Sequence, residues 1–468
     1  MSREMEGNNF GDRRLETRAP RILESLGSSP KQSVNASFVG HASTAAAYRF
    51  LKNPKVTPDR LLSAHRLQSL ERASAHPSVL LIQDTSEADF TSLATLKGAG
   101  PLSCKERRGA FLHTSLMVAP GGMPLGLHDI DFMVRRDEEH GKRETRKSRP
   151  IEEKESHRWL EGYRKACELN DGLEDTGVIS VADREADIYE VFAEWQKRRD
   201  EGETPADFVI RASENRVLEG KHEGRKLFDL DQEGEALGEI EFEVPAATQR
   251  YKVKGNTRIS HRRKRRVKQE LRAHRISLRP PARKGRKLPP VELFLVTATE
   301  VGTPADQRPV NWRLLTSKPV ETLEEAREII GIYRDRWQIE VYFKVLKSGC
   351  RVEELGLKEM KGLERAITML GIVAWRQLHV THLAREAPET PCGEVFETHE
   401  WEGALRVLEP GREKYEEPTL GQFILKVAKL GGYLDRKHDP PPGSEVLWRG
   451  MLKVEAYGEA WLAFSKSN

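Results

Sequence analysis

Two short apolar runs that each end in an aspartate constrain the fold most strongly. Ser78 to Asp84 reads SVLLIQD, and Thr176 to Asp183 reads TGVISVAD. Continuous apolar runs of this length are typical of buried strands. In an open α/β sheet, ligand-binding and catalytic sites lie where the strands end. We therefore expect an α/β fold in which Asp84 and Asp183 lie close to a functional site.

A third acid lies on a stretch with the period of an amphipathic helix, YRDRWQIEVYFKVLK from Tyr333 to Lys347. At about 100° per residue, a phenol and three cations fall within roughly 40° of Glu340, namely Tyr333, Arg336, Lys344 and Lys347. The apolar side chains form an adjacent face. This arrangement suits a metal-bound polyanion, because the acid can coordinate the metal and the basic side chains can bind phosphate oxygens. The same pattern also fits a solvated helix face with i,i+4 ion pairs.

Together, Asp84, Asp183 and Glu340 could hold two hard divalent cations through carboxylate oxygens. A two-metal site activates a water or hydroxyl on one side of a phosphodiester and stabilises the leaving oxygen on the other. It needs no covalent intermediate and no histidine base. The alternative is that each strand-end aspartate only caps a turn.

The charge distribution points to one local contact with a polyanion. The formal net charge of the chain is only +4, yet Arg250 to Lys287 contains seventeen Lys and Arg residues against a single acid, Glu270. The rest of the chain is therefore net acidic, and the basic block is a local feature. We read Arg216 to Leu288 as a β-rich insertion, in which the segment Arg258 to Arg275 forms an exposed edge or loop.

The two ends of the chain read as helical. Residues 1 to about 70 contain a helix from Asp12 to Leu26 whose arginines form a basic side; this side could follow a phosphate backbone or simply face solvent. From Glu386 onward, proline-rich joints separate helical pieces that fit either a partner surface or a closed tail. The four cysteines are far apart and form no CxxC, so we expect reduced thiols in a cytoplasmic protein. No apolar run approaches the length of a membrane span.

Several further elements are expected between these ends. Two strand-like runs, Gly109 to Ala119 and Pro124 to Val134, are separated by a Pro-Gly-Gly hairpin signal. Ile151 to Glu168 reads as a helix, and the residues after Asp183 read as a helix that follows the strand directly. A long apolar helix is expected from Lys358 to Arg385.

Three motifs in this order resemble the cut-and-paste DDE transposases of bacterial insertion sequences, and more narrowly their IS4 family. They are IQDTS around Asp84, VADREADIY around Asp183, and Y-x2-R-x3-E-x6-K from Tyr333 to Lys347. The resemblance implies a ribonuclease-H-like catalytic core with a β-rich insertion, a helical DNA-binding domain before it and a helical dimerisation domain after it. These domains would cover residues 1–70, 71–385 (with the insertion at about 216–288) and 386–468.

The resemblance also assigns roles to single residues. Asp84, Asp183 and Glu340 match the catalytic triad, which binds two Mg²⁺ ions, with Mn²⁺ as a substitute. The other residues that match the family are expected to contact DNA. Tyr333, Arg336 and Lys347 would hold the terminal phosphate and the DNA end, beside Lys344 on the same stripe. Trp312 would stack on a base flipped out of the transposon end, although a strand tryptophan also suits a core. Arg211 matches an active-site arginine, and Arg14 and Arg18 are candidates for contacts with the inverted repeats.

The implied activity is transposition of double-stranded DNA by a homodimer in a synaptic complex, without a membrane partner and at the bacterial nucleoid. The enzyme would cut the ends of the transposon by hydrolysis and hairpin formation and then join the 3′-OH ends to target DNA. Two alternatives remain. The chain could be an inactive or domesticated DNA-binding protein, or a stand-alone nuclease with the same core.

Overall fold

The structure is a computed structural model that describes residues 1–139, 149–244, 246–253, 256–282, 288–439 and 441–465. It divides into two compact units. Unit 1 comprises Met1–His76, Asp84–Gly141 and Gln338–Asn468, and unit 2 comprises Pro77–Gln83 and Lys142–Trp337. Each unit is described by itself.

Unit 2 is built on a mixed sheet. The neighbouring strands, in order across the sheet, are the first half of β1 (Ser78–Asp89), β5 (Gly177–Ala182), β6 (Asp207–Arg211), β13 (Trp312–Thr316), β12 (Val291–Val301), β11 (Arg265–Leu278) and β7 (Leu218–Glu219), with β8 (Gly238–Val244) also paired to β11. The first three strands run parallel, and the others pair antiparallel. The expected α/β class is confirmed, with strands at both apolar runs.

The parallel pair β1 and β5 forms because both strands are apolar on both faces. Val79 to Ile82 are completely buried, and the polar exception, Gln83, donates a hydrogen bond from Nε2 to Ser180 Oγ at 3.1 Å. The register of the pair ends at Gln83 and Ala182. The next residues along the chain are Asp84 and Asp183, so both acids directly follow the last pair of the register. Asp183 lies just beyond the end of β5, but the expectation that a strand also ends at Asp84 is wrong, because β1 continues to Asp89.

The basic segment contradicts one expectation, because Arg265 to Leu278 is the interior strand β11 and neither an edge nor a loop. In the first half of this strand, Val267, Gln269 and Leu271 are buried. The opposite face carries bases that form cross-strand ion pairs with glutamates of β8: Arg266–Glu241 at 3.6 Å, Lys268–Glu239 at 2.6 Å and, from the residue before the strand, Lys264–Glu243 at 3.0 Å. These three bases are therefore balanced by acids of the same insertion.

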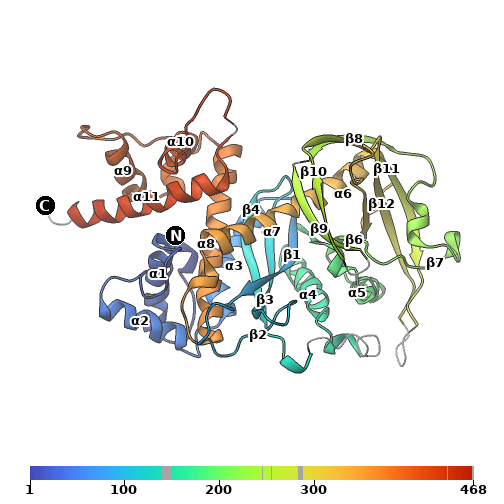
Figure 1. The fold of residues 1–468 in the computed structure, drawn as a ribbon, viewed down its shortest axis with the longest axis horizontal. Helices are drawn as coiled ribbons and strands as arrows, with labels where there is room; N and C mark the ends of the chain where they lie inside the picture. Colours follow the sequence, from blue (N-terminus) through green and yellow to red (C-terminus); the bar gives the residue numbers. More distant parts are fainter. Residues whose placement is uncertain (140–148, 245, 254–255, 283–287, 440, 466–468) are drawn as a thin grey trace. The chain divides into compact units, whose positions relative to one another are not determined.

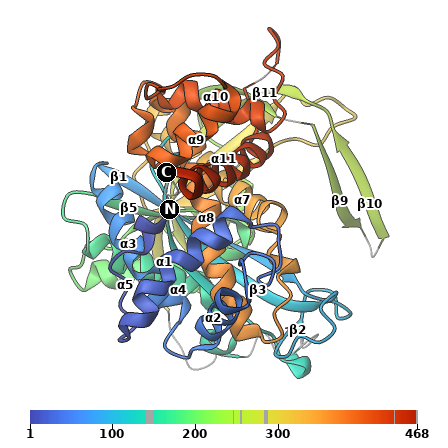
Figure 2. The ribbon, with the colours of Figure 1, turned by 90° about the vertical axis from the view of Figure 1, so that its left-hand side faces the viewer.

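Strands β9 (Ala247–Val253) and β10 (Asn256–Arg262) form a separate two-stranded hairpin within the insertion. Figure 2 shows this hairpin as a ribbon that projects away from β11. The hairpin therefore presents its backbone apart from the main sheet of unit 2.

Among the residues of unit 2 that the structure describes, the main helices are α4 (His157–Asp171), α5 (Tyr189–Asp200) and α6 (Leu323–Asp335). The helix expected from Ile151 begins later, after the 3-10 turn η3 (Ile151–Glu153). The expected direct passage from Asp183 into a helix is wrong, because the 3-10 turn η4 (Arg184–Ala186) intervenes. Asp187 fixes this break: its buried carboxylate accepts hydrogen bonds from the backbone of Ser213 and Glu214 and pairs with Arg216.

Unit 1 contains the expected hairpin of β3 (Arg108–Val118) and β4 (Pro124–Met133), with β2 (Gly100–Pro101) and the later half of β1 beside β3. Around it lie the remaining α-helices of the unit, α1 (Arg13–Ser28), α2 (His41–Lys52), α3 (Pro58–Ser74), α7 (Trp337–Lys344), α8 (Met360–Glu386), α9 (Thr398–Leu408), α10 (Leu420–Leu430) and α11 (Ser444–Ser465). As expected, α8 is a long buried helix, and it packs with α3 against β4 (Figure 1).

Short turns complete the described chain. They are η1 (Ser2–Met5), η2 (Asp137–Glu139), η5 (Gly220–His222), η6 (Leu227–Leu230), the π-helical turn η7 (Val345–Gly349), η8 (Val352–Glu354) and η9 (Cys392–Glu394). The C-terminal helices have a hydrophobic cluster of their own, centred on Phe396, Trp401 and Phe423. The four cysteines are free thiols, as expected. Within the described ranges, no helix is long and apolar enough to cross a bilayer.

A buried charge network fixes the first turn of unit 1 to its core. His65 Nε2 accepts a hydrogen bond from Leu127 N at 2.9 Å, so the proton lies on Nδ1, which donates to Glu4 Oε2. Arg72 also donates to both oxygens of Glu4, at 3.1 and 3.2 Å, and its guanidinium lies over the Trp375 ring. Burial alone would raise the pKa of Glu4, but the hydrogen bonds from His65 and Arg72, together with the charge of Arg72, outweigh it and lower that pKa to about 2.

We predict that Glu4→Gln destabilises the protein at neutral pH by about 3 kcal/mol, since the pKa lowered from 4.5 to about 2 contributes roughly this much. A lowered carboxyl pKa stabilises above pH 4.5, and the contribution disappears as the pH falls towards 2. Urea unfolding at several pH values should therefore show a smaller loss of stability on acidification for Glu4→Gln. The matched control is Glu6→Gln, which changes an exposed neighbour; equal behaviour of the two variants would contradict the assignment.

Candidate active site

Asp183 of unit 2 directly follows β5 and caps the turn η4, because its Oδ1 accepts a hydrogen bond from Glu185 N at 3.0 Å. Its neighbour Arg184 has a pKa lowered by partial burial and by the charge of Arg211, while Asp183 and Tyr333 oppose this shift. Three of the residues singled out in the sequence, Asp183, Arg211 and Tyr333, therefore interact electrostatically with one guanidinium of unit 2.

Arg211 ends β6 and is half-buried beside β13, where it donates a hydrogen bond to Asn311 O at 3.2 Å. Trp312 begins β13 and is also only half-buried, so it is not a core tryptophan. Its indole meets Tyr333 edge-on, with ring centroids 5.8 Å apart. The aromatic and arginine contacts expected near a DNA end therefore come from the ends of neighbouring strands and from α6.

The stretch that was expected to be one helix is interrupted. Helix α6 ends at Asp335, Arg336 forms its cap, and α7 carries Glu340. Tyr333 and Arg336 are buried, with 6% and 9% of their surface exposed, so the expectation of one exposed stripe is wrong. The arginine lies over the tyrosine ring, 5.7 Å from its centroid.

In unit 1, Asp84 and Glu340 are both half-buried, and Asp84 Oδ1 accepts a hydrogen bond from Thr85 N at 2.7 Å. Lys344 is exposed at the end of α7. Lys347 lies in the π-helical turn, where the 100° spacing no longer applies, and its Nζ is 3.8 Å from Glu353. π-helical turns are frequent at functional sites, because they change the direction in which side chains project.

The basic side expected on the first helix is present on α1. Arg14 is exposed and Arg18 is half-buried, and both flank the face that the buried residues Leu15, Ala19 and Ile22 form. Asp12 caps the helix by accepting a hydrogen bond from Arg14 N at 3.0 Å. Both arginines are therefore placed for contact with an external anion.

The three acids fit a hard divalent cation by the chemistry of their oxygen donors. Neither unit by itself contains all three, because Asp183 belongs to unit 2 and the other two to unit 1. Across the part of the chain that the structure describes, no group of three or more His, Cys, Asp or Glu side chains is arranged to hold a metal ion.

Two residues that contact the predicted site residues were not predicted from the sequence. Phe242 of β8 stacks on Trp312, and Glu353 accepts a hydrogen bond from Asp89 N at 2.9 Å while it pairs with Lys347. Phe242 stands in the alternating run GEIEFEV, which gave no sign of its aromatic partner. Glu353 carried no signal, because its role depends on the π-helical turn.

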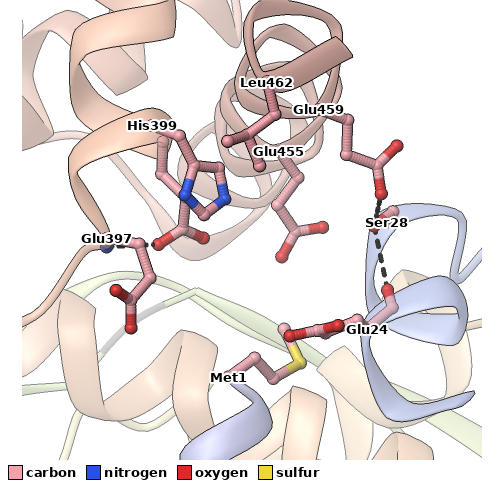
Figure 3. A pocket seen from close by; sticks show the side chains of 9 residues that line it. Met1, Glu24, Ser28, Glu397, His399, Glu455, Glu459 and Leu462 are labelled. Atoms are coloured by element: carbon pink, nitrogen blue, oxygen red, sulfur yellow. Dashed lines mark hydrogen bonds between the residues drawn. The ribbon is translucent and has the colours of Figure 1, made fainter. Parts of the chain in front are cut away.

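A second titratable cluster surrounds a cavity of about 190 Å³ between α1, α9 and α11 of unit 1. Five carboxylates line it, from Glu24, Glu397, Glu400, Glu455 and Glu459. Figure 3 shows the Glu455 carboxylate pointing into this space. Burial raises the pKa of Glu455 to about 8, although Arg376, whose Nη1 is 3.9 Å from the carboxylate, opposes the shift.

Comparison with protein families finds three matches in sequence order. Residues 1–56 match the family described as Transposase DNA-binding, residues 163–376 match Transposase DDE domain, and residues 372–467 match Transposase Tn5 dimerisation domain. This series of domains defines a DDE transposase. The chain belongs to the Tn5-like DDE transposases of the IS4 family. The matches support DNA binding and dimer formation, and the DDE domain implies the use of a divalent metal.

We predict that Glu455→Gln flattens the pH dependence of stability. Between about pH 4.5 and pH 8 the folded protein keeps a proton on Glu455 that the unfolded chain has released, so stability falls as the pH rises. The glutamine variant should lose this slope, which is at most about 1.4 kcal/mol per pH unit, and should be the more stable form above pH 8.

Urea unfolding from pH 5 to pH 9 measures this effect, with Glu445→Gln as the control because it changes an exposed glutamate on the same helix. Parallel pH profiles for wild type and Glu455→Gln would show that the Glu455 carboxyl is not protonated in the folded protein.

Proposed function

We propose that this protein is a cut-and-paste transposase that binds the terminal inverted repeats of its element, cleaves both ends and joins them to target DNA. The observation that carries the proposal is the parallel register of β1 and β5, which ends one residue before Asp84 and one residue before Asp183. The match to the DDE domain supports the same assignment.

Asp84, Asp183 and Glu340 would hold two Mg²⁺ ions, and Mn²⁺ would serve the same oxygen donors. When bound, such ions activate the attacking oxygen and stabilise the leaving oxygen of a phosphodiester. The protein itself holds the carboxylates of the two aspartates in place. Backbone N–H groups hold one oxygen of each aspartate, through Thr85 N and Glu185 N.

The cationic residues would position the DNA end. Arg211, Arg336, Lys344 and Lys347 offer N–H donors to phosphate oxygens, and Tyr333 offers a hydroxyl. Trp312 would receive a flipped-out base, because every base has a flat face that stacks on an indole. On α1, Arg14 and Arg18 would contact the inverted repeat.

The reaction series alternates hydrolysis of a phosphodiester bond with transesterification, in which one phosphodiester bond is exchanged for another. Water attacks at the end of the element and releases a 3′-OH, which then attacks the opposite strand and closes a hairpin. Water opens the hairpin, and the 3′-OH finally attacks target DNA. Each attack displaces one oxygen leaving group, so the series needs no oxidant and no external energy source.

The proposed division of labour places end binding in residues 1–70, catalysis in residues 71–385 and dimerisation in residues 386–468. In the synaptic dimer each subunit would cut the end that its partner holds. End binding and cleavage are then separable functions, which allows a direct test.

We predict that Glu340→Ala lowers the rate of Mg²⁺-dependent cleavage of end-containing DNA by at least about a hundredfold, because loss of a metal ligand removes several kcal/mol of transition-state stabilisation. Binding of the same DNA in a gel-shift assay should remain detectable. Glu324→Ala, which changes an exposed glutamate on α6, should cleave like wild type. Full cleavage activity in Glu340→Ala would remove Glu340 from the active site.

A further inference from the structure

Phe242 and Trp312 form a nearly parallel ring stack within unit 2. Their ring centroids are 5.5 Å apart and their planes differ by 15°. Both side chains are half-buried. The residues on either side of Phe242, Glu241 and Glu243, pair with bases on the other face of β8. The strand alternation therefore directs Phe242 away from the ionic face and towards the indole.

The stack continues on both sides. Tyr333 contacts Trp312 edge-on, and Arg336 lies over the Tyr333 ring. At the other end, the guanidinium carbon of Arg334 lies 5.5 Å from the centroid of Phe242. The result is a row of three aromatic rings with an arginine at each end. All five residues belong to unit 2, on β8, on β13 and at the end of α6.

This row has the chemistry of a nucleobase site. Aromatic side chains bind bases by stacking, with little dependence on sequence, and arginines add cation–π and phosphate contacts. A half-buried indole with free rotation would lose entropy when it accepts a base. A ring already stacked parallel on that indole reduces this loss, because it fixes the plane beforehand.

We propose that Phe242 is a positioning residue that holds the plane of Trp312 for a nucleobase extruded from the transposon end. This inference rests on the proposed function, in which Trp312 receives that base. Phe242 acts through the indole, and its own contact with DNA is not required. The surface is defined by flat rings, so it suits any of the four bases.

The experiment uses the full-length protein and duplexes of the element's own terminal repeat, with 2-aminopurine at each of the first few positions of the non-transferred strand. Fluorescence of 2-aminopurine rises when the base leaves the stack, so it reports extrusion separately from cleavage. Four variants are compared. Phe242→Leu keeps apolar bulk without a flat ring, Phe242→Tyr keeps the ring, Trp312→Ala removes the platform, and Phe228→Ala is the matched control.

Phe228 suits this control because it is a half-buried phenylalanine of the same insertion with a guanidinium over its ring, 4.0 Å from Arg313. We expect Phe242→Leu to reduce both base extrusion and cleavage rate by about fivefold, the worth of one aromatic pair. Phe242→Tyr and Phe228→Ala should match wild type. On duplexes with an abasic site at the extruded position, Phe242→Leu and wild type should cleave equally, since no base remains to be held.

Four results would overturn the inference. If Phe242→Leu extrudes the base as well as wild type while Trp312→Ala does not, Phe242 has no positioning role and the proposed function stands. If Phe242→Leu increases extrusion, the ring blocks the indole. If Trp312→Ala also leaves extrusion unchanged, the proposed base-stacking role of Trp312 fails as well. An equal loss in Phe242→Leu on intact and abasic duplexes would show a purely structural effect.

Discussion

The parallel pairing of β1 with β5 is the interaction on which the rest of the proposed site depends. Both strands are buried because both faces are apolar, and a one-residue slip would change which residues follow the last pair. The register is therefore strongly specified by burial, and it fixes the last pair of the two strands, which Asp84 and Asp183 directly follow. Backbone hydrogen bonds then hold each carboxylate. The positions of the two aspartates proposed as metal ligands therefore follow from the packing of the core.

Local signals made much of this fold predictable. The apolar runs predicted β1 and β5, and Thr322 with Glu325 forms the capping box that starts α6. Features that depend on contacts distant in sequence were not predictable. The interior place of β11 depends on its pairing with glutamates of β8, and the break before α5 depends on the buried carboxylate of Asp187.

The candidate site, too, was predictable only in part. Motif spacing and the family resemblance proposed the acids, the cations and Trp312 as site residues. It did not show the break at Arg336, the π-helical turn around Lys347 or the stack of Phe242 on Trp312. A helical wheel assumes one uninterrupted period, so it placed Tyr333 on a surface where the structure buries it.

The most direct measurement of whether three acids share one metal site is iron-directed cleavage of the polypeptide. Fe²⁺ replaces Mg²⁺ in the full-length protein bound to its end DNA, and hydroxyl radicals generated at the iron cut the backbone next to it. We predict cuts beside Asp84, Asp183 and Glu340 together, all suppressed by excess Mg²⁺. Cuts beside only one or two of these acids, or only elsewhere in the chain, would contradict the shared site.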